Sequence, residues 1–100
     1  MSWVLFNTAE YKRIMVLSPI SGRLFFFAAT QMDEGNILVL SPDIKQGFIR
    51  DMRECGKRIS MQSIHNSVNE LKKSGVFTEV SRGTYRISRR IFSKVHGGAE

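Results

Sequence analysis

Apolar residues in the second half of the chain recur at the spacing of one helix face. Over residues 60–75, Ile64, Val68 and Leu71 are four and three residues apart and form a single stripe. This segment begins with a serine, a favoured N-cap, and ends with a glycine, which tolerates the left-handed backbone found at helix ends. Short apolar runs on both sides of residues 81–83 (Ser-Arg-Gly) then predict a β-hairpin. The pattern therefore predicts a helix followed directly by a hairpin.

The preceding residues predict two further helices and a strand. Residues 23–32 are apolar almost all round, which is typical of a central helix buried by its neighbours, and residues 19–22 (Pro-Ile-Ser-Gly) are interpreted as punctuation before it. A short apolar run predicts a strand over residues 37–40. The pair Ser41-Pro42, a cap followed by proline at the first helical position, predicts a helix that ends near Gly56.

Helix, strand, helix, helix, strand, strand is the element order of a winged helix-turn-helix. We therefore predict an α+β fold with a three-helix core, a small antiparallel sheet and a β-hairpin wing. This winged-helix DNA-binding domain is expected to span residues 19–94, with a last helical turn over residues 89–94. Residues 1–18 are expected to form an N-terminal arm with a short strand or helix, and residues 95–100 a disordered tail.

Basic residues are concentrated in the half of the chain that contains the predicted helix and hairpin. The net charge is +6; residues 1–50 hold five basic and four acidic side chains, whereas residues 51–100 hold ten basic and five acidic. Neutralisation of phosphates supplies most of the non-specific affinity of proteins for nucleic acid. This asymmetry indicates double-stranded DNA as the partner, with a solvated basic face as the alternative.

The face of the predicted helix opposite the apolar stripe carries short amides and hydroxyls, which can hydrogen-bond base edges. Basic side chains before the helix, at its end and in the hairpin are expected to contact phosphates, with Arg82 at the tip entering the minor groove. Among these residues, Gln62, Ser63 and Asn66 are the expected base readers. The candidate DNA-binding residues are Lys57, Arg58, Ser60, Gln62, Ser63, Asn66, Asn69, Lys72, Lys73, Arg82 and Arg86.

The sequence offers no arrangement typical of catalysis or of a cofactor site. His65 has no serine or cysteine placed by sequence to use it as a base, the acidic residues lack metal-ligand spacing, and no glycine-rich phosphate loop occurs. We therefore expect no enzymatic activity, metal or cofactor. The single cysteine, Cys55, excludes an internal disulfide and is interpreted as a core residue at a helix end. Together with the absence of a signal peptide or a bilayer-length apolar run, it predicts a cytoplasmic protein without a membrane role.

Two parts of the sequence resemble known DNA-binding families. Residues 60–75 carry serine, isoleucine, asparagine, valine, leucine and glycine at the spacing of the recognition-helix signature of many winged-helix proteins. The wider frame is similar to the replication initiation proteins of RepL type from small plasmids: an apolar helix ending in Met32-Asp33, a strand over residues 37–40, and a tyrosine-containing wing strand over 83–88 that continues into 89–92. This resemblance implies sequence-specific binding to an origin or operator and recruitment of host replication proteins, without catalysis.

The leading hypothesis is therefore double-stranded DNA binding in plasmid or phage replication initiation or its control. A transcriptional repressor or other regulator with the same fold is an alternative, because both read an operator-like site by the same physics. A winged helix used for protein–protein interaction is a further alternative. A homodimer is common among such DNA readers, and the apolar arm at residues 3–6 is the candidate interface for one.

Overall fold

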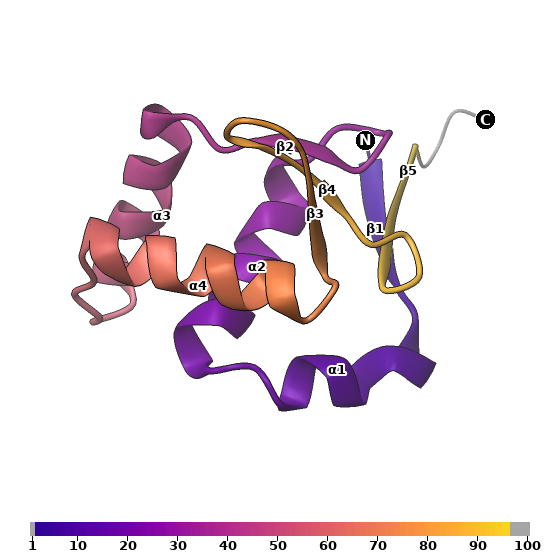
Figure 1. Cartoon of the computed structure of the whole chain (residues 1–100), viewed down its shortest axis with the longest axis horizontal. Helices are drawn as coiled ribbons and strands as arrows, with labels where there is room; N and C mark the ends of the chain where they lie inside the picture. Colours follow the sequence, from indigo (N-terminus) through magenta and orange to yellow (C-terminus); the bar gives the residue numbers. More distant parts are fainter. Residues whose placement is uncertain (1, 97–100) are drawn as a thin grey trace.

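The computed structural model describes residues 2–96 and shows an α+β protein (Figure 1). Within these residues, four α-helices and one 3₁₀ helix are combined with two small antiparallel sheets. The helices are η1 (Thr8–Glu10), α1 (Tyr11–Met15), α2 (Pro19–Gln31), α3 (Pro42–Glu54) and α4 (Met61–Lys73). The strands are β1 (Ser2–Phe6), β2 (Ile37–Val39), β3 (Phe77–Ser81), β4 (Thr84–Ile87) and β5 (Phe92–His96).

The predicted bounds of α3 and α4 are confirmed. Each helix begins after a serine whose side chain caps it. Ser41 Oγ accepts a hydrogen bond from the Ile44 N–H at 3.2 Å, and Ser60 Oγ accepts one from the Ser63 N–H at 3.1 Å. Gly75 follows α4 with a φ of +80°, the left-handed conformation expected at a helix end.

The predicted start of α2 at Arg23 is wrong, because the helix begins at Pro19. Ser18-Pro19 is the same pair of cap and proline that begins α3, so residues 19–22 form the first helical turn rather than punctuation. The prediction that α2 is buried all round is also wrong. Phe25 is fully buried, whereas the Phe26 side chain is 51% exposed, because consecutive helix residues point about 100° apart.

A three-stranded sheet with the order β2-β4-β3 packs against α4 through β3, and its buried side chains share one core with those of α2 and α4. Its buried side chains alternate along β4, where Tyr85 and Ile87 point inward and Arg86 points outward. The β3–β4 hairpin turns at Gly83, whose φ is +75°. The Gly83 carbonyl also accepts a hydrogen bond from the Leu40 N–H at 2.8 Å, which fixes the hairpin tip beside the start of α3.

The second sheet pairs β1 with β5, so the two ends of the described chain lie side by side (Figure 1). The predicted helical turn over residues 89–94 is therefore wrong: residues 89–91 form a turn, and β5 follows because it pairs with β1 from the other end of the chain. Residues 95 and 96, predicted to belong to a disordered tail, are the last two of β5, and residues 97–100 lie outside the described range. The N-terminal segment contains both a strand and short helices, with Asn7 rather than Thr8 capping η1.

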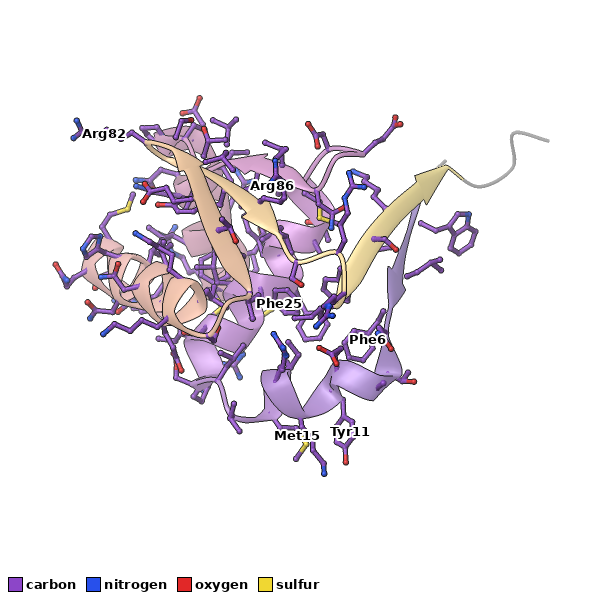
Figure 2. The ribbon with its side chains drawn as sticks, turned by 45° about the vertical axis from the view of Figure 1, so that its right-hand side comes forward. Phe6, Tyr11, Met15, Phe25, Arg82 and Arg86 are labelled. Carbon is purple, nitrogen blue, oxygen red and sulfur yellow. The ribbon has the colours of Figure 1, made fainter. Side chains whose placement is uncertain are left out.

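One hydrophobic core joins both sheets to the helices. Phe25 of α2 stacks on Phe92 of β5 with ring centroids 4.6 Å apart, and Phe6 of β1 meets the same Phe92 ring edge-on at 5.4 Å. Figure 2 shows Phe25 in the interior and Phe6 near the end of β1. Lys94 of β5 also donates to the carbonyl of Met32 at the end of α2, at 2.6 Å. The second sheet is thus attached to α2 through β5.

Candidate nucleic-acid interface

The outer face of α4 presents amide side chains on a buried apolar support. Gln62 and Asn66 are exposed, while Ile64, Val68 and Leu71 are buried beneath them. Gln62 Nε2 donates a hydrogen bond to Asn66 Oδ1 at 3.0 Å, one helical turn away. This bond orients both side chains, so the two predicted readers form one unit, which we term the amide pair.

The amide pair keeps two functional atoms available. Gln62 Oε1 and Asn66 Nδ2 have no hydrogen-bond partner within the part of the chain that the structure describes. One is an acceptor and the other a donor. The pair therefore offers one acceptor and one donor to a ligand.

The third predicted reader, Ser63, and the other candidate residues of α4 contribute less to this surface. The Ser60 hydroxyl accepts from the Ser63 N–H and lies 3.2 Å from the Ser63 hydroxyl, so both serines take part in capping α4. Asn69 is only half-exposed, and Lys73 is exposed at the helix end. Among the candidate residues with amide or hydroxyl groups on α4, the amide pair is therefore the most exposed.

Lys72 and Glu79 form an ion pair between α4 and β3. Lys72 Nζ lies 3.0 Å from Glu79 Oε1. The hydrogen bond with Glu79 raises the pKa of Lys72, and the hydrogen bond with Lys72 lowers the pKa of Glu79. Lys72, predicted to contact phosphate, is thus already partnered by a carboxylate, and the pair connects the helix to the hairpin.

The two arginines of the hairpin occupy different faces. Arg82 is exposed at the tip and points away from the body of the protein (Figure 2). Glu79 contacts Lys72 of α4 and is paired with Tyr85, so these two side chains lie on the face of the sheet turned toward α4. Side chains alternate along a strand, so Arg86, next to Tyr85, lies on the opposite face. The structure therefore does not bring Arg86 to the surface of the amide pair.

A groove of about 350 Å³ separates the start of α3, the first turns of α4 and the hairpin. Gln62 and His65 of α4, Lys45 of α3 and the Tyr85 ring line it. Lys45 was not among the predicted site residues. The available signal was the predicted start of α3 at Ser41-Pro42. That start places Lys45 near the positive end of the helix dipole, where a phosphate is favoured.

Lys57 and Arg58 belong to a separate basic region before α4. Arg58 shares a pocket of about 360 Å³ with Arg53 of α3 and two isoleucines, and both Lys57 and Arg58 lie beside Arg23 at the start of α2. Lys57 and Arg58 are exposed. The predicted phosphate contacts thus lie in three separate places: Arg82 at the hairpin tip, Lys72 and Lys73 at the end of α4, and Lys57 and Arg58 in the loop between α3 and α4.

Glu70 holds α4 against the start of α2. Its carboxylate accepts hydrogen bonds from the Ser18 N–H at 3.1 Å, from the Ser18 hydroxyl at 2.7 Å and from the Ser21 hydroxyl. The bond from Ser21, followed by those from Ser18, lowers the pKa of Glu70. This network sets the position of the helix that carries the amide pair.

No group of three His, Cys, Asp or Glu side chains within residues 2–96 is arranged to hold a metal ion, and no helix there is long and apolar enough to cross a bilayer. Cys55 is exposed, so its predicted place in the core is wrong.

Comparisons of the chain with protein-family models, with curated protein sequences and with solved structures found no match. The resemblance to RepL-type initiation proteins therefore depends on the residues of this sequence alone.

Proposed function

We propose that this protein is a winged-helix protein that binds double-stranded DNA in a sequence-specific manner. In support, the order α2, β2, α3, α4, β3, β4 and the sheet order β2-β4-β3 are compatible with that fold. In this proposal α4 is the recognition helix and the β3–β4 hairpin is the wing. RepL-type initiation proteins remain the suggested relatives, on the motifs quoted above.

The observation that carries the proposal is the convergence of three features on one side of the molecule. The amide pair lies on the first turns of α4, Lys45 lies across the groove from Gln62, and the Leu40–Gly83 hydrogen bond keeps the wing tip beside the start of α3. Exposed amides flanked by basic side chains are the combination that reads base edges and neutralises phosphates.

The amide pair suggests a preference for adenine. In the major groove adenine presents the N6 amino donor beside the N7 acceptor. Gln62 Oε1 would accept from N6 and Asn66 Nδ2 would donate to N7. Arg82, Lys45 and Lys73 would contact phosphates, with Lys57 and Arg58 on the flank. Arg86 and Lys72 are removed from the proposed contacts, the first by its direction and the second by its partner Glu79.

The proposed biological role is plasmid or phage replication initiation, or its control, in the cytoplasm, with host replication proteins as further partners and without catalysis. A transcriptional regulator with the same DNA-binding surface is the second candidate. A footprint of the protein at a replication origin supports the first role, and a footprint confined to a promoter supports the second.

Selection of duplexes from a random pool, followed by affinity measurements on the selected sequence, tests the proposal. Asn66→Ala is expected to weaken binding to the selected duplex by about 1–3 kcal/mol and to random duplex by much less, since only base contacts depend on sequence. Gln31→Ala removes an exposed amide from α2 and serves as the matched control, with both affinities unchanged.

Equal losses on selected and random duplex would refute base reading by α4. Retention of no duplex at all would refute DNA binding and favour the alternative in which the same surface meets a protein.

A further inference from the structure

Strand β1 has one edge without a partner strand among the described residues. The Asn7 N–H donates to the Ile91 carbonyl at 2.8 Å, which continues the ladder between β1 and β5. Backbone groups alternate in direction along an antiparallel strand, so Leu5 and Trp3 also point toward β5. The N–H and C=O groups of Val4 and Phe6 therefore point outward.

The start of β5 is attached to the other sheet on the side away from β1. Phe92 accepts a hydrogen bond from Asn36 Nδ2 at 2.7 Å, and the same amide donates to Ile87 of β4 at 3.2 Å. Asn36 is buried between the two sheets. The two-stranded sheet is thus joined to β4 at the start of β5, whereas the described residues make no such link from β1.

The open edge lacks the features that normally prevent edge strands from associating. Strand β1 has the sequence Ser-Trp-Val-Leu-Phe, with no charge, proline or bulge. The side chains of Trp3 and Leu5 are each 56% exposed. Phe6 contacts the buried Phe92 ring and so lies on the inner face of the sheet. Successive side chains of a strand point to opposite faces, so Leu5 and Trp3 lie on the outer face. An isolated two-stranded sheet is also only marginally stable, and further strands would stabilise it.

We propose that β1 pairs with β1 of a second copy of this chain, giving a two-fold dimer with a continuous four-stranded sheet β5-β1-β1-β5. In the antiparallel register centred on Val4, all five residues of each strand are paired, and the outward backbone groups face one another. Trp3 then packs beside Leu5 of the second copy on the outer face, and the reciprocal contact forms by symmetry.

The sequence of β1 favours a second copy as the occupant. Two chains with a net charge of +6 each repel one another, and β1 adds no charged group of its own to that repulsion. The strand therefore has no charge that would attract an acidic or basic partner. The strand is also self-complementary about its central valine, with an aromatic residue on one side and an aliphatic residue on the other.

The dimer would leave the proposed DNA-binding surface open. In Figure 1, β1 and β5 lie on the side of the molecule opposite α3. The two copies of α4 would then suit a two-fold symmetric DNA site. This consequence rests on the proposed function, whereas the pairing of β1 does not. A dimer reads half-sites separated by about 34–36 Å or a multiple of that distance.

Sedimentation equilibrium of the full chain without DNA tests the pairing. The wild type is expected to show twice the monomer mass of 11.4 kDa, and Val4→Pro one monomer mass. Proline at Val4 removes an outward N–H but no bond of the β1–β5 ladder. Val4→Thr keeps the N–H and the β-branched shape and should remain dimeric. Circular dichroism confirms that each variant is folded.

A second pair of variants keeps every backbone donor. Leu5→Lys places a charge opposite Trp3 of the second copy and should give a monomer, while Met15→Lys changes an exposed residue that points away on α1 (Figure 2) and should remain dimeric. A wild type that stays monomeric at several hundred micromolar, or folded Val4→Pro and Leu5→Lys proteins that both stay dimeric, would overturn the proposal. Because no DNA is present, either result leaves the test of Asn66 unaffected.

Discussion

The two sheets of this protein are built from strands of similar length but are stabilised in different ways. The three-stranded sheet buries Phe77, Tyr85 and Ile87 against the helices. In the two-stranded sheet, the β1 side chains from Trp3 to Phe6 are all exposed, and the burial is supplied by Phe92 at the start of β5. The three-stranded sheet is thus stabilised by its own buried side chains. The two-stranded sheet is stabilised mainly by Phe92, at the point where β5 begins.

This difference assigns different uses to the two regions. A sheet that is packed against helices can hold a hairpin tip in a fixed position, which a recognition surface requires. A sheet with an open apolar edge suits association with another strand. The chain therefore separates a polar and basic surface around α4 from an apolar and uncharged surface at β1.

The largest expected effect comes from removing the ring that joins the two regions. Phe25 is fully buried and stacks on Phe92, so Phe25→Ala is expected to lower the free energy of unfolding by about 3–5 kcal/mol, measured by chemical denaturation. The neighbouring Phe26→Ala is the matched control and should cost far less, because half of that side chain is already exposed. Similar losses for both variants would contradict a core shared by the two sheets.

The second prediction concerns the amide that links β4 to β5. Asn36→Gly keeps the left-handed backbone, whose φ is +61°, but leaves the carbonyls of Ile87 and Phe92 without their donor. We expect a loss of about 2 kcal/mol. Asn36→Ala should cost about 1 kcal/mol more, because alanine tolerates this φ poorly. If the alanine variant is as stable as the glycine variant, the backbone conformation carries none of the loss.

The third prediction is smaller and depends on pH. Hydrogen bonds from Ser21 and Ser18 lower the pKa of Glu70, so the carboxylate stabilises the folded state above its ordinary pKa near 4.5. Glu70→Gln should therefore cost roughly 1 kcal/mol at pH 7, a modest value because water screens the site. The difference from the wild type should shrink as the pH falls through the lowered pKa. A difference that stays constant from pH 7 to pH 2 would exclude this role.

Much of the helical framework could be predicted because its signals are local. Ser41-Pro42 and Ser60 begin α3 and α4 as expected, and Gly75 ends α4. Ser18-Pro19 carried the same signal for α2, but the nearby glycine led to the wrong start.

A short strand was one expectation for the N-terminal arm, but β5 and its pairing with β1 could not be predicted, because their cause is not local. Strand β5 forms because residues 92–96 pair with residues 2–6, and no alternation of apolar and polar residues marks it in advance. The directions of Arg82 and Arg86 also depend on tertiary structure. The Lys72–Glu79 pair likewise needs the hairpin to fold back beside α4. Sequence alone therefore identified the basic residues but could not say which ones face the candidate site.

The two hairpin arginines test the central claim most directly, since they are exposed, close in sequence and identical in charge. The measurement is the slope of log affinity against log salt for duplex DNA, compared among the wild type, Arg82→Ala and Arg86→Ala. The account predicts that Arg82→Ala lowers the magnitude of the slope by about 0.9, the value for one lost phosphate contact, while Arg86→Ala leaves it unchanged. Equal slopes for the two variants, or a change confined to Arg86→Ala, would contradict the proposed binding surface.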